Sequence, residues 1–77
     1  MEETTGLEWT SARTSSNVSE IGYDPTEMKL GVRFQNGSEY HYSNVPPGVV
    51  AQFRSAYSPG SFLYKNIRNV YTSERIK

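Results

Sequence analysis

An alternation of apolar and polar residues over residues 28–34 constrains this chain more than any other feature. Successive side chains of an extended strand point to opposite faces, so this segment predicts a strand with one apolar face, made of Met28, Leu30, Val32 and Phe34. An Asn36-Gly37 pair, a strong turn signal, follows, and Tyr40-His41-Tyr42 returns after it. The order predicts a β-hairpin that carries a Tyr-x-Tyr pair.

The type of turn decides where the two tyrosines lie. A two-residue type I′ turn at Asn36-Gly37 places Tyr40 opposite Arg33, and both tyrosines then form an exposed aromatic surface. A three-residue loop, with Gly37 left-handed at a bulge, places Tyr40 opposite Val32 and adds both tyrosines to the apolar face. We favour the bulged loop, because a small sheet needs its apolar residues on one side. Glu39 and His41 then point outward with Arg33.

The remaining elements give the order β-β-β-α-α. Residues 15–23 read as a first strand, in which Val18 and Ile21 have opposite parity, so we expect an irregularity between them. Two amphipathic helices are predicted after the hairpin, one following Pro46-Pro47 and one beginning at Pro59. Their apolar stripes are Val49, Val50, Phe53, Ala56 and Tyr57, and then Phe62, Leu63, Ile67, Val70 and Tyr71. We therefore predict an α+β fold, a three-stranded antiparallel meander covered on one face by two α-helices.

The two ends of the chain read as polar extensions of this domain. Residues 1–14 form a predicted flexible acidic leader, residues 15–71 the domain, and residues 72–77 a polar tail. Trp9 is the exception in the leader, because an indole brings enough apolar area to dock on the domain or on a neighbouring chain.

Length and composition limit the class of protein. The 77 residues suffice for one small domain, whose core adds little stability. We therefore expect that the domain can self-associate. The absence of cysteine excludes disulfides and thiolate metal sites. The first residues lack the basic and apolar runs of an export signal, and no apolar run reaches the length of a membrane span. We expect a cytoplasmic protein.

A net charge of zero conceals an uneven distribution of charge. Residues 1–27 hold six acidic residues against Arg13, a charge of minus five. Residues 28–77 hold seven basic residues against Glu39 and Glu74, a charge of plus five. This distribution indicates either an anionic ligand for the basic domain or an ordinary solvated surface with an uneven tail, and the sequence leaves both readings open.

The ordered motifs of the chain resemble the KTSC domain, a family named for lysyl-tRNA synthetases, some of which carry it at their C-terminus. The resemblance runs from about Ser15 to Tyr71, and Tyr40-x-Tyr42 matches the family's hallmark. It rests on Ser15-Ser16-Asn17-Val18, Ile21-Gly22-Tyr23-Asp24, Leu30-Gly31-Val32-Arg33-Phe34, Asn36-Gly37, Tyr40-His41-Tyr42, Val45-Pro46, Ala56-Tyr57-Ser58-Pro59-Gly60-Ser61-Phe62 and Ile67-Arg68. The family also occurs as stand-alone bacterial or phage proteins, and its synthetase context implies RNA binding. This chain carries no synthetase.

Seven residues are the candidates for binding. Tyrosines and a histidine can stack on bases, and arginines and lysines can contact phosphates, provided that they share one face. These residues are Arg33, Tyr40, His41, Tyr42, Arg54, Lys65 and Arg68. We expect a small binding domain for RNA or another nucleic acid. The alternatives are an oligomer that binds a small anionic nucleotide between its subunits, and a protein-interaction module.

Catalysis and cofactors are not expected from these residues. His41 is the single histidine, and no nucleophile-elbow motif, glycine-rich phosphate loop or cluster of metal ligands accompanies it. We therefore expect neither an enzyme nor a protein with a metal or cofactor.

Overall fold

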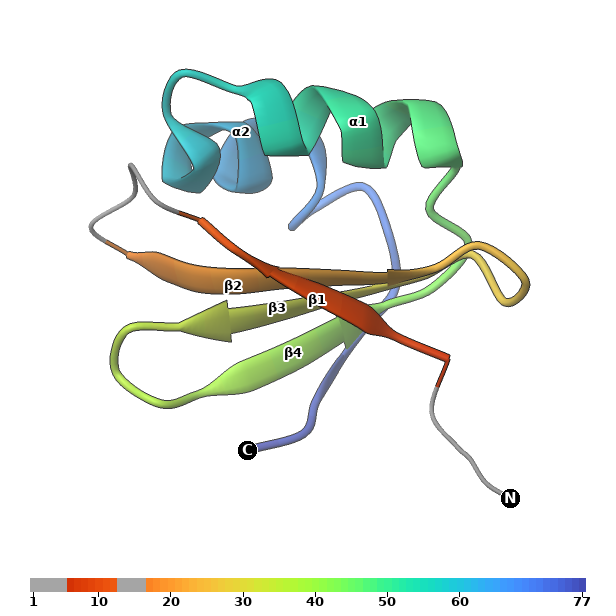
Figure 1. Ribbon diagram of the computed structural model, residues 1–77, viewed down its shortest axis with the longest axis horizontal. Coiled ribbons are helices and arrows are strands. Elements are labelled where there is room, and N and C mark those ends of the chain that lie inside the picture. The colour runs from red at the N-terminus through yellow and green to blue at the C-terminus, as the bar shows by residue number, and fades with distance from the viewer. Residues whose placement is uncertain (1–5, 13–16) are drawn as a thin grey trace.

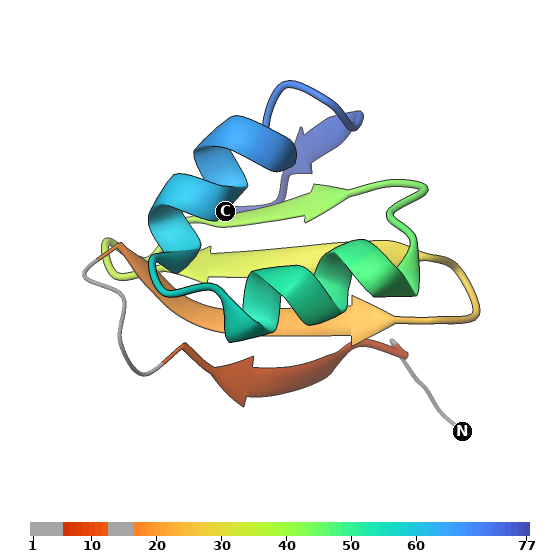
Figure 2. The same cartoon turned by 90° about the horizontal axis from the view of Figure 1, so that it is seen from above.

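One antiparallel sheet and two helices make up the computed structural model, which describes residues 6–12 and 17–77. In these residues the elements are β1 (Glu8–Ser11), β2 (Val18–Asp24), β3 (Lys29–Phe34), β4 (Glu39–Tyr42), α1 (Pro47–Ser55), α2 (Pro59–Asn66) and β5 (Ser73–Arg75). The strands follow the order β1-β2-β3-β4-β5, and both helices cover the same face (Figures 1 and 2). The α+β fold is confirmed.

The sheet has five strands, so the prediction of three strands is wrong. The additional strands extend the predicted meander at both edges: β1 comes from the segment 1–14 expected to be a leader, and β5 from the tail 72–77. Both are short edge strands that are almost entirely exposed, so they lack the apolar alternation that reveals a buried strand. Pairing with β2 and β4 forms them, and that pairing cannot be read from their own composition. Residues 1–5, 13 and 14 of the expected leader lie outside the described residues.

The hairpin of β3 and β4 has the predicted bulged loop. Val32 pairs with Tyr40 and Leu30 with Tyr42. The backbone N–H of Phe34 donates to the carbonyl of Ser38 over 2.9 Å, and Gly37 has a φ of 93°. Tyr40 and Tyr42 therefore lie on the face that the helices cover. The expected irregularity in β2 is also confirmed, since the register of β2 against β3 shifts between Val18 and Glu20.

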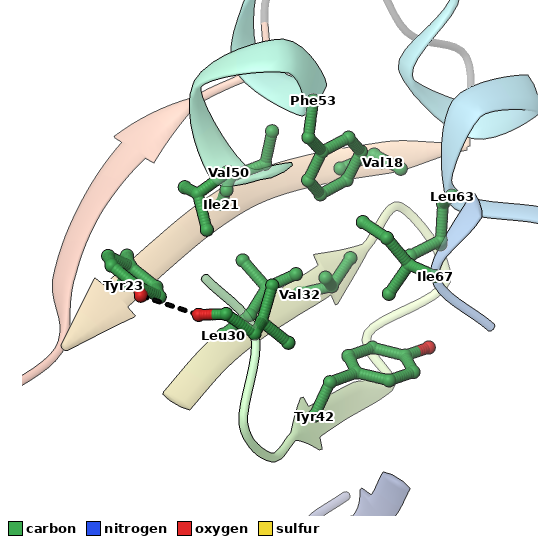
Figure 3. Close-up of a cluster of buried hydrophobic side chains, with 11 residues drawn as sticks. Val18, Ile21, Tyr23, Leu30, Val32, Tyr42, Val50, Phe53, Leu63 and Ile67 are labelled. Carbon is green, nitrogen blue, oxygen red and sulfur yellow. Dashed lines mark hydrogen bonds between the residues drawn. The ribbon is translucent and has the colours of Figure 1, made fainter. Parts of the chain in front are cut away.

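The core lies between the sheet and the helices (Figure 3). Its buried members are Val18, Ile21, Tyr23, Leu30, Val32, Tyr42, Val45, Val50, Phe53, Leu63 and Ile67. The Phe53 ring stacks on Phe62 with centroids 5.8 Å apart, which ties α1 to α2. Within the core the Tyr23 hydroxyl donates to the backbone carbonyl of Val45.

Both helices end earlier than their apolar stripes predict. α1 ends at Ser55, so Tyr57 is 99% exposed, and α2 ends at Asn66, so Val70 is 62% exposed. Ile67 is nevertheless buried, in the turns that follow α2. At nine and eight residues, neither of the described helices is long and apolar enough to cross a membrane.

Candidate ligand-binding cleft

The structure divides the seven residues predicted to bind a ligand. Arg33 and His41 lie on the face of the sheet opposite the helices, here called the outer face. Arg54 on α1 and Lys65 on α2 are exposed. The remaining three, Tyr40, Tyr42 and Arg68, line one cleft on the helix side of the sheet. The predicted set is therefore spread over several surfaces, and these three residues share a concave site.

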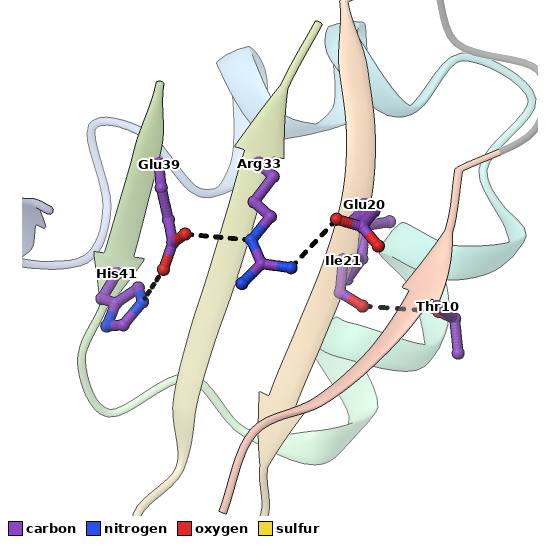
Figure 4. A network of polar contacts seen from close by, with 6 residues as sticks. All are labelled: Thr10, Glu20, Ile21, Arg33, Glu39 and His41. Atoms are coloured by element: carbon purple, nitrogen blue, oxygen red, sulfur yellow. Dashed lines mark hydrogen bonds and ion pairs between the residues drawn. The ribbon is translucent and has the colours of Figure 1, made fainter. Parts of the chain in front are cut away.

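On the outer face, Arg33 bridges two carboxylates. Its Nε donates to Glu39 over 2.9 Å, and its Nη1 donates to Glu20 over 3.0 Å (Figure 4). The guanidinium carbon also lies 3.8 Å from the centroid of the Trp9 ring, a cation–π contact. Glu39 accepts a second hydrogen bond of 2.8 Å from His41 Nε2. These residues, called here the outer-face network, are Trp9, Glu20, Arg33, Glu39 and His41.

Charge pairing controls protonation in this network. Burial disfavours the charged form of Glu39, which is only 6% exposed, but the hydrogen bonds from Arg33 and His41 outweigh that effect. The pKa of Glu39 therefore lies below its usual value. The hydrogen bonds to Glu39 and Glu20 in turn raise the pKa of Arg33. The positive charge of Arg33 is thus balanced by two carboxylates, which makes it a weaker partner for a phosphate than an arginine without an ion pair.

The cleft lies between α2 and the β3–β4 hairpin and has a volume of about 630 Å³. We call it the Tyr42 cleft. Its volume falls within the range of small-ligand sites, roughly 300–1,000 Å³. The described residues that line it are Asn17, Phe34, Gln35, Asn36, Ser38, Tyr40, Tyr42, Gly60, Leu63, Tyr64, Arg68 and Ser73. One of these, Arg68, carries a charge at neutral pH, so the lining favours an anion.

The hydroxyl of Tyr42 is the unusual group in this cleft. Tyr42 is 3% exposed, yet its hydroxyl has no hydrogen-bond partner within the described part of the chain. Figure 3 shows the hydroxyl at the margin of the core, on the side of Leu63 and Ile67 and away from the Tyr23 hydrogen bond. Burial raises the pKa of Tyr42, and the positive charge of Arg68 acts in the opposite direction. The hydroxyl is therefore a neutral donor close to a cation.

Arg68 is the cation of this cleft, and it has no carboxylate partner among the described residues. It lies two residues after the end of α2, where its backbone N–H donates to the carbonyl of Leu63 over 2.8 Å. Its guanidinium carbon lies 5.5 Å from the centroid of the Tyr64 ring, and it makes no ion pair with any described residue. A ring that enters the cleft meets Phe34, Tyr40 and Tyr64, of which Phe34 and Tyr40 are in edge-to-face contact.

The cleft contains residues that the sequence did not single out, above all Tyr64 and the polar loop around Asn36. Tyr64 and Arg68 are four positions apart, the spacing at which side chains meet on a helix. That spacing was the one sequence signal that could have placed Tyr64 beside Arg68. For metal chemistry, the described residues contain no group of three or more histidine, aspartate or glutamate side chains. The lining instead provides rings, hydroxyls, amides and one guanidinium, which are groups that bind and orient a ligand.

Comparison with known proteins shows one family. The family model of the KTSC domain matches residues 14–71. A crystal structure of a KTSC domain protein from Yersinia pestis superposes with a TM-score of 0.83 at 30% identity, covering 92% of this chain and 99% of that protein. Two further relatives, from Tsukamurella paurometabola and Stutzerimonas stutzeri, are each 43% identical over 49 residues. That match covers 64% of this chain, and 73% and 69% of the two proteins respectively.

Proposed function

This chain belongs to the KTSC domain family, and from that premise we propose that it binds a small anionic ligand with a flat ring, of the nucleotide class, in the Tyr42 cleft. The observation that carries the proposal is the buried hydroxyl of Tyr42, which has no partner among the described residues and lies in the same cleft as Arg68. A buried donor without an acceptor costs about 1–3 kcal/mol. A ligand acceptor removes that cost.

The remaining groups of the cleft suit the two parts of such a ligand. An anionic oxygen can accept from both Tyr42 and Arg68, because charge-assisted hydrogen bonds are the stronger kind. The rings of Tyr40 and Tyr64 offer surfaces against which a base can stack. The amides of Gln35 and Asn36 at the rim can read the edge of a base.

The distribution of basic residues favours a small nucleotide over a long nucleic acid. A strand of RNA needs several cations along one path. Of the four cations predicted to bind, Arg33 holds two carboxylates on the outer face, and Arg54 and Lys65 do not line the cleft, so Arg68 is the one that lines it. Arg75 of β5 lies beside the cleft, with its guanidinium carbon 6.0 Å from the centroid of the Tyr40 ring. Two cations suit a small anion better than a long strand.

The test is titration of the protein, followed by amide chemical shifts or calorimetry, with the four ribonucleoside monophosphates, inorganic phosphate and a single-stranded oligoribonucleotide. We expect a monophosphate to bind and to shift the amides of Tyr42 and Arg68. Tyr42→Phe should weaken that binding about tenfold or more, because a hydrogen bond to a charged group is worth about 1.5–3 kcal/mol. Arg68→Ala should weaken it by a similar factor.

Lys65→Ala is the matched control, because it removes a cation from α2 that does not line the cleft. Equal losses for Lys65→Ala and Arg68→Ala would contradict a local site and indicate a diffuse field. Binding of the oligoribonucleotide alone, with a steep dependence on salt, would replace the nucleotide by RNA. Binding of none of these compounds would overturn the proposal.

A further inference from the structure

The outer face contains a slot that is filled by an aromatic ring. Gly22 of β2 and Gly31 of β3 are paired in register, and Trp9 of β1 pairs with Gly22. A Cβ atom built on either glycine would lie 2.7 Å from an indole carbon, which is closer than real Cβ atoms approach. The two absent side chains therefore create the space in which the indole lies.

The slot is built by one part of the chain and filled by another. Gly22, Gly31 and the stacked Arg33 all fall within residues 14–71, the span of the family match. Glu20 and Glu39 fix Arg33 in place from the same span. Trp9 comes from β1, which precedes that span. The site that receives the ring is thus complete without the strand that provides it.

Apart from the indole and the backbone ladder, two long side-chain hydrogen bonds attach β1 to the domain. Thr10 Oγ1 donates to the carbonyl of Ile21 over 3.4 Å (Figure 4), and Arg54 Nη2 donates to the carbonyl of Glu8 over 3.5 Å. Every residue of β1 except Trp9 is exposed, and β1 contributes no residue to the buried core. Its backbone pairs with β2 at the edge of the sheet, where an extended segment of another chain can pair in the same way. One indole, the edge ladder and two long side-chain hydrogen bonds therefore hold this strand.

We propose that the β2 edge, the slot between Gly22 and Gly31, and Arg33 form a docking site for a tryptophan-bearing strand, and that the strand it accepts from outside is β1 of a second copy. Reciprocal exchange of β1 recreates the same contacts in both copies, which is the low-cost route to a dimer. In this arrangement each copy places its Trp9 in the partner's slot.

The test uses the fact that Trp9 is the single tryptophan of the chain. The host is the full chain carrying Trp9→Ala and Thr10→Pro. The backbone N–H of Ala12 donates to the carbonyl of Ser19, and hydrogen-bonded pairs recur at every second residue of an antiparallel ladder. Thr10, which pairs with Ile21, is therefore also a hydrogen-bonded position. Proline at this position has no N–H to donate, so it releases the host's own β1 from the sheet. The probe is a synthetic peptide of residues 6–12. We expect its indole emission to move to shorter wavelength as the host is added.

The matched control adds Gly22→Ala to the host. The three nearest atoms that a Cβ at Gly22 would meet all belong to Trp9, so this alanine is accommodated in a host without the indole and closes the slot to the peptide. We expect the control host to bind the peptide at least about tenfold more weakly. Equal binding by both hosts, or no binding to the first, overturns the docking site.

Light scattering tests the second copy. The wild-type chain should shift from monomer to dimer between micromolar and millimolar concentration, and the Trp9→Ala chain should remain monomeric over the same range. A wild-type chain that stays monomeric at millimolar concentration, or a Trp9→Ala chain that dimerises equally well, overturns the exchange.

Discussion

The outer-face network and the Tyr42 cleft are built from the same types of residue and differ in how fully those residues are satisfied. Each has one arginine beside an aromatic ring: Arg33 over Trp9, and Arg68 near Tyr64. Arg33 also holds two carboxylates, whereas Arg68 has no ion pair among the described residues. An arginine next to an aromatic residue therefore does not by itself indicate a binding site. The group that still lacks a partner after folding is the informative one.

The largest expected effect comes from breaking the outer-face network. Glu39→Ala leaves Arg33 and His41 without their shared acceptor and removes two hydrogen bonds in which charge takes part. We expect a loss of about 2–3 kcal/mol of unfolding free energy, measured by denaturant titration. Arg68→Ala in the cleft is the counterpart and should cost less than about 0.5 kcal/mol. Equal losses for the two variants would remove the distinction between the surfaces.

The fold was predictable only where the burial of side chains sets the pattern of apolar and polar residues. The alternation of β3 and the need for a one-sided core identified the bulged turn at Gly37 and the inward direction of Tyr40 and Tyr42. The exposed edge strands β1 and β5 could not be found in this way, because backbone pairing rather than side-chain burial forms them.

The candidate site was predictable only in part. Residue type selected Tyr40, Tyr42 and Arg68, which line one cleft, and also Arg33 and His41, which hydrogen-bond to Glu39 on the other face. The sequence cannot distinguish a paired arginine from an open one, since the partner of Arg33 is set by strand register. Glu39 stands opposite Arg33 only in the bulged register.

The pH dependence of stability provides the second comparison. The pKa of Glu39 is lower in the folded chain than its usual value of 4.5. Its contribution is therefore fully present above pH 4.5 and is lost as the pH falls through the folded pKa. We expect the melting temperature of the wild type to fall in this acidic range more steeply than that of Glu39→Gln. Parallel curves for the two chains would show that Glu39 does not titrate as a paired group.

The slot on the outer face gives a smaller effect. Gly31→Ala places a Cβ atom 2.7 Å from the indole of Trp9, so the ring must leave its position or the strands must move apart. We expect a loss of about 1–2 kcal/mol and a shift of the tryptophan emission to longer wavelength. Gly48→Ala is the control, because a Cβ on Gly48 meets nothing within 4 Å. An unchanged emission spectrum in Gly31→Ala would contradict the placement of Trp9.

The smallest effect on stability, and the sharpest comparison, comes from two buried tyrosines in one row of the sheet. Tyr23 and Tyr42 both pair with Leu30 across neighbouring strands, but Tyr23 donates to the carbonyl of Val45 and Tyr42 has no acceptor among the described residues. Tyr23→Phe removes that hydrogen bond and should cost about 1 kcal/mol, the usual net value of an intramolecular hydrogen bond. Tyr42→Phe removes a donor that nothing in the described chain uses, so unfolding free energy should change by less than about 0.5 kcal/mol or rise. Thermal and denaturant unfolding of the two variants side by side measures the difference. A loss for Tyr42→Phe as large as that for Tyr23→Phe would mean that the Tyr42 hydroxyl has a hydrogen-bond partner within the protein. The main observation behind a ligand in the cleft would then be removed.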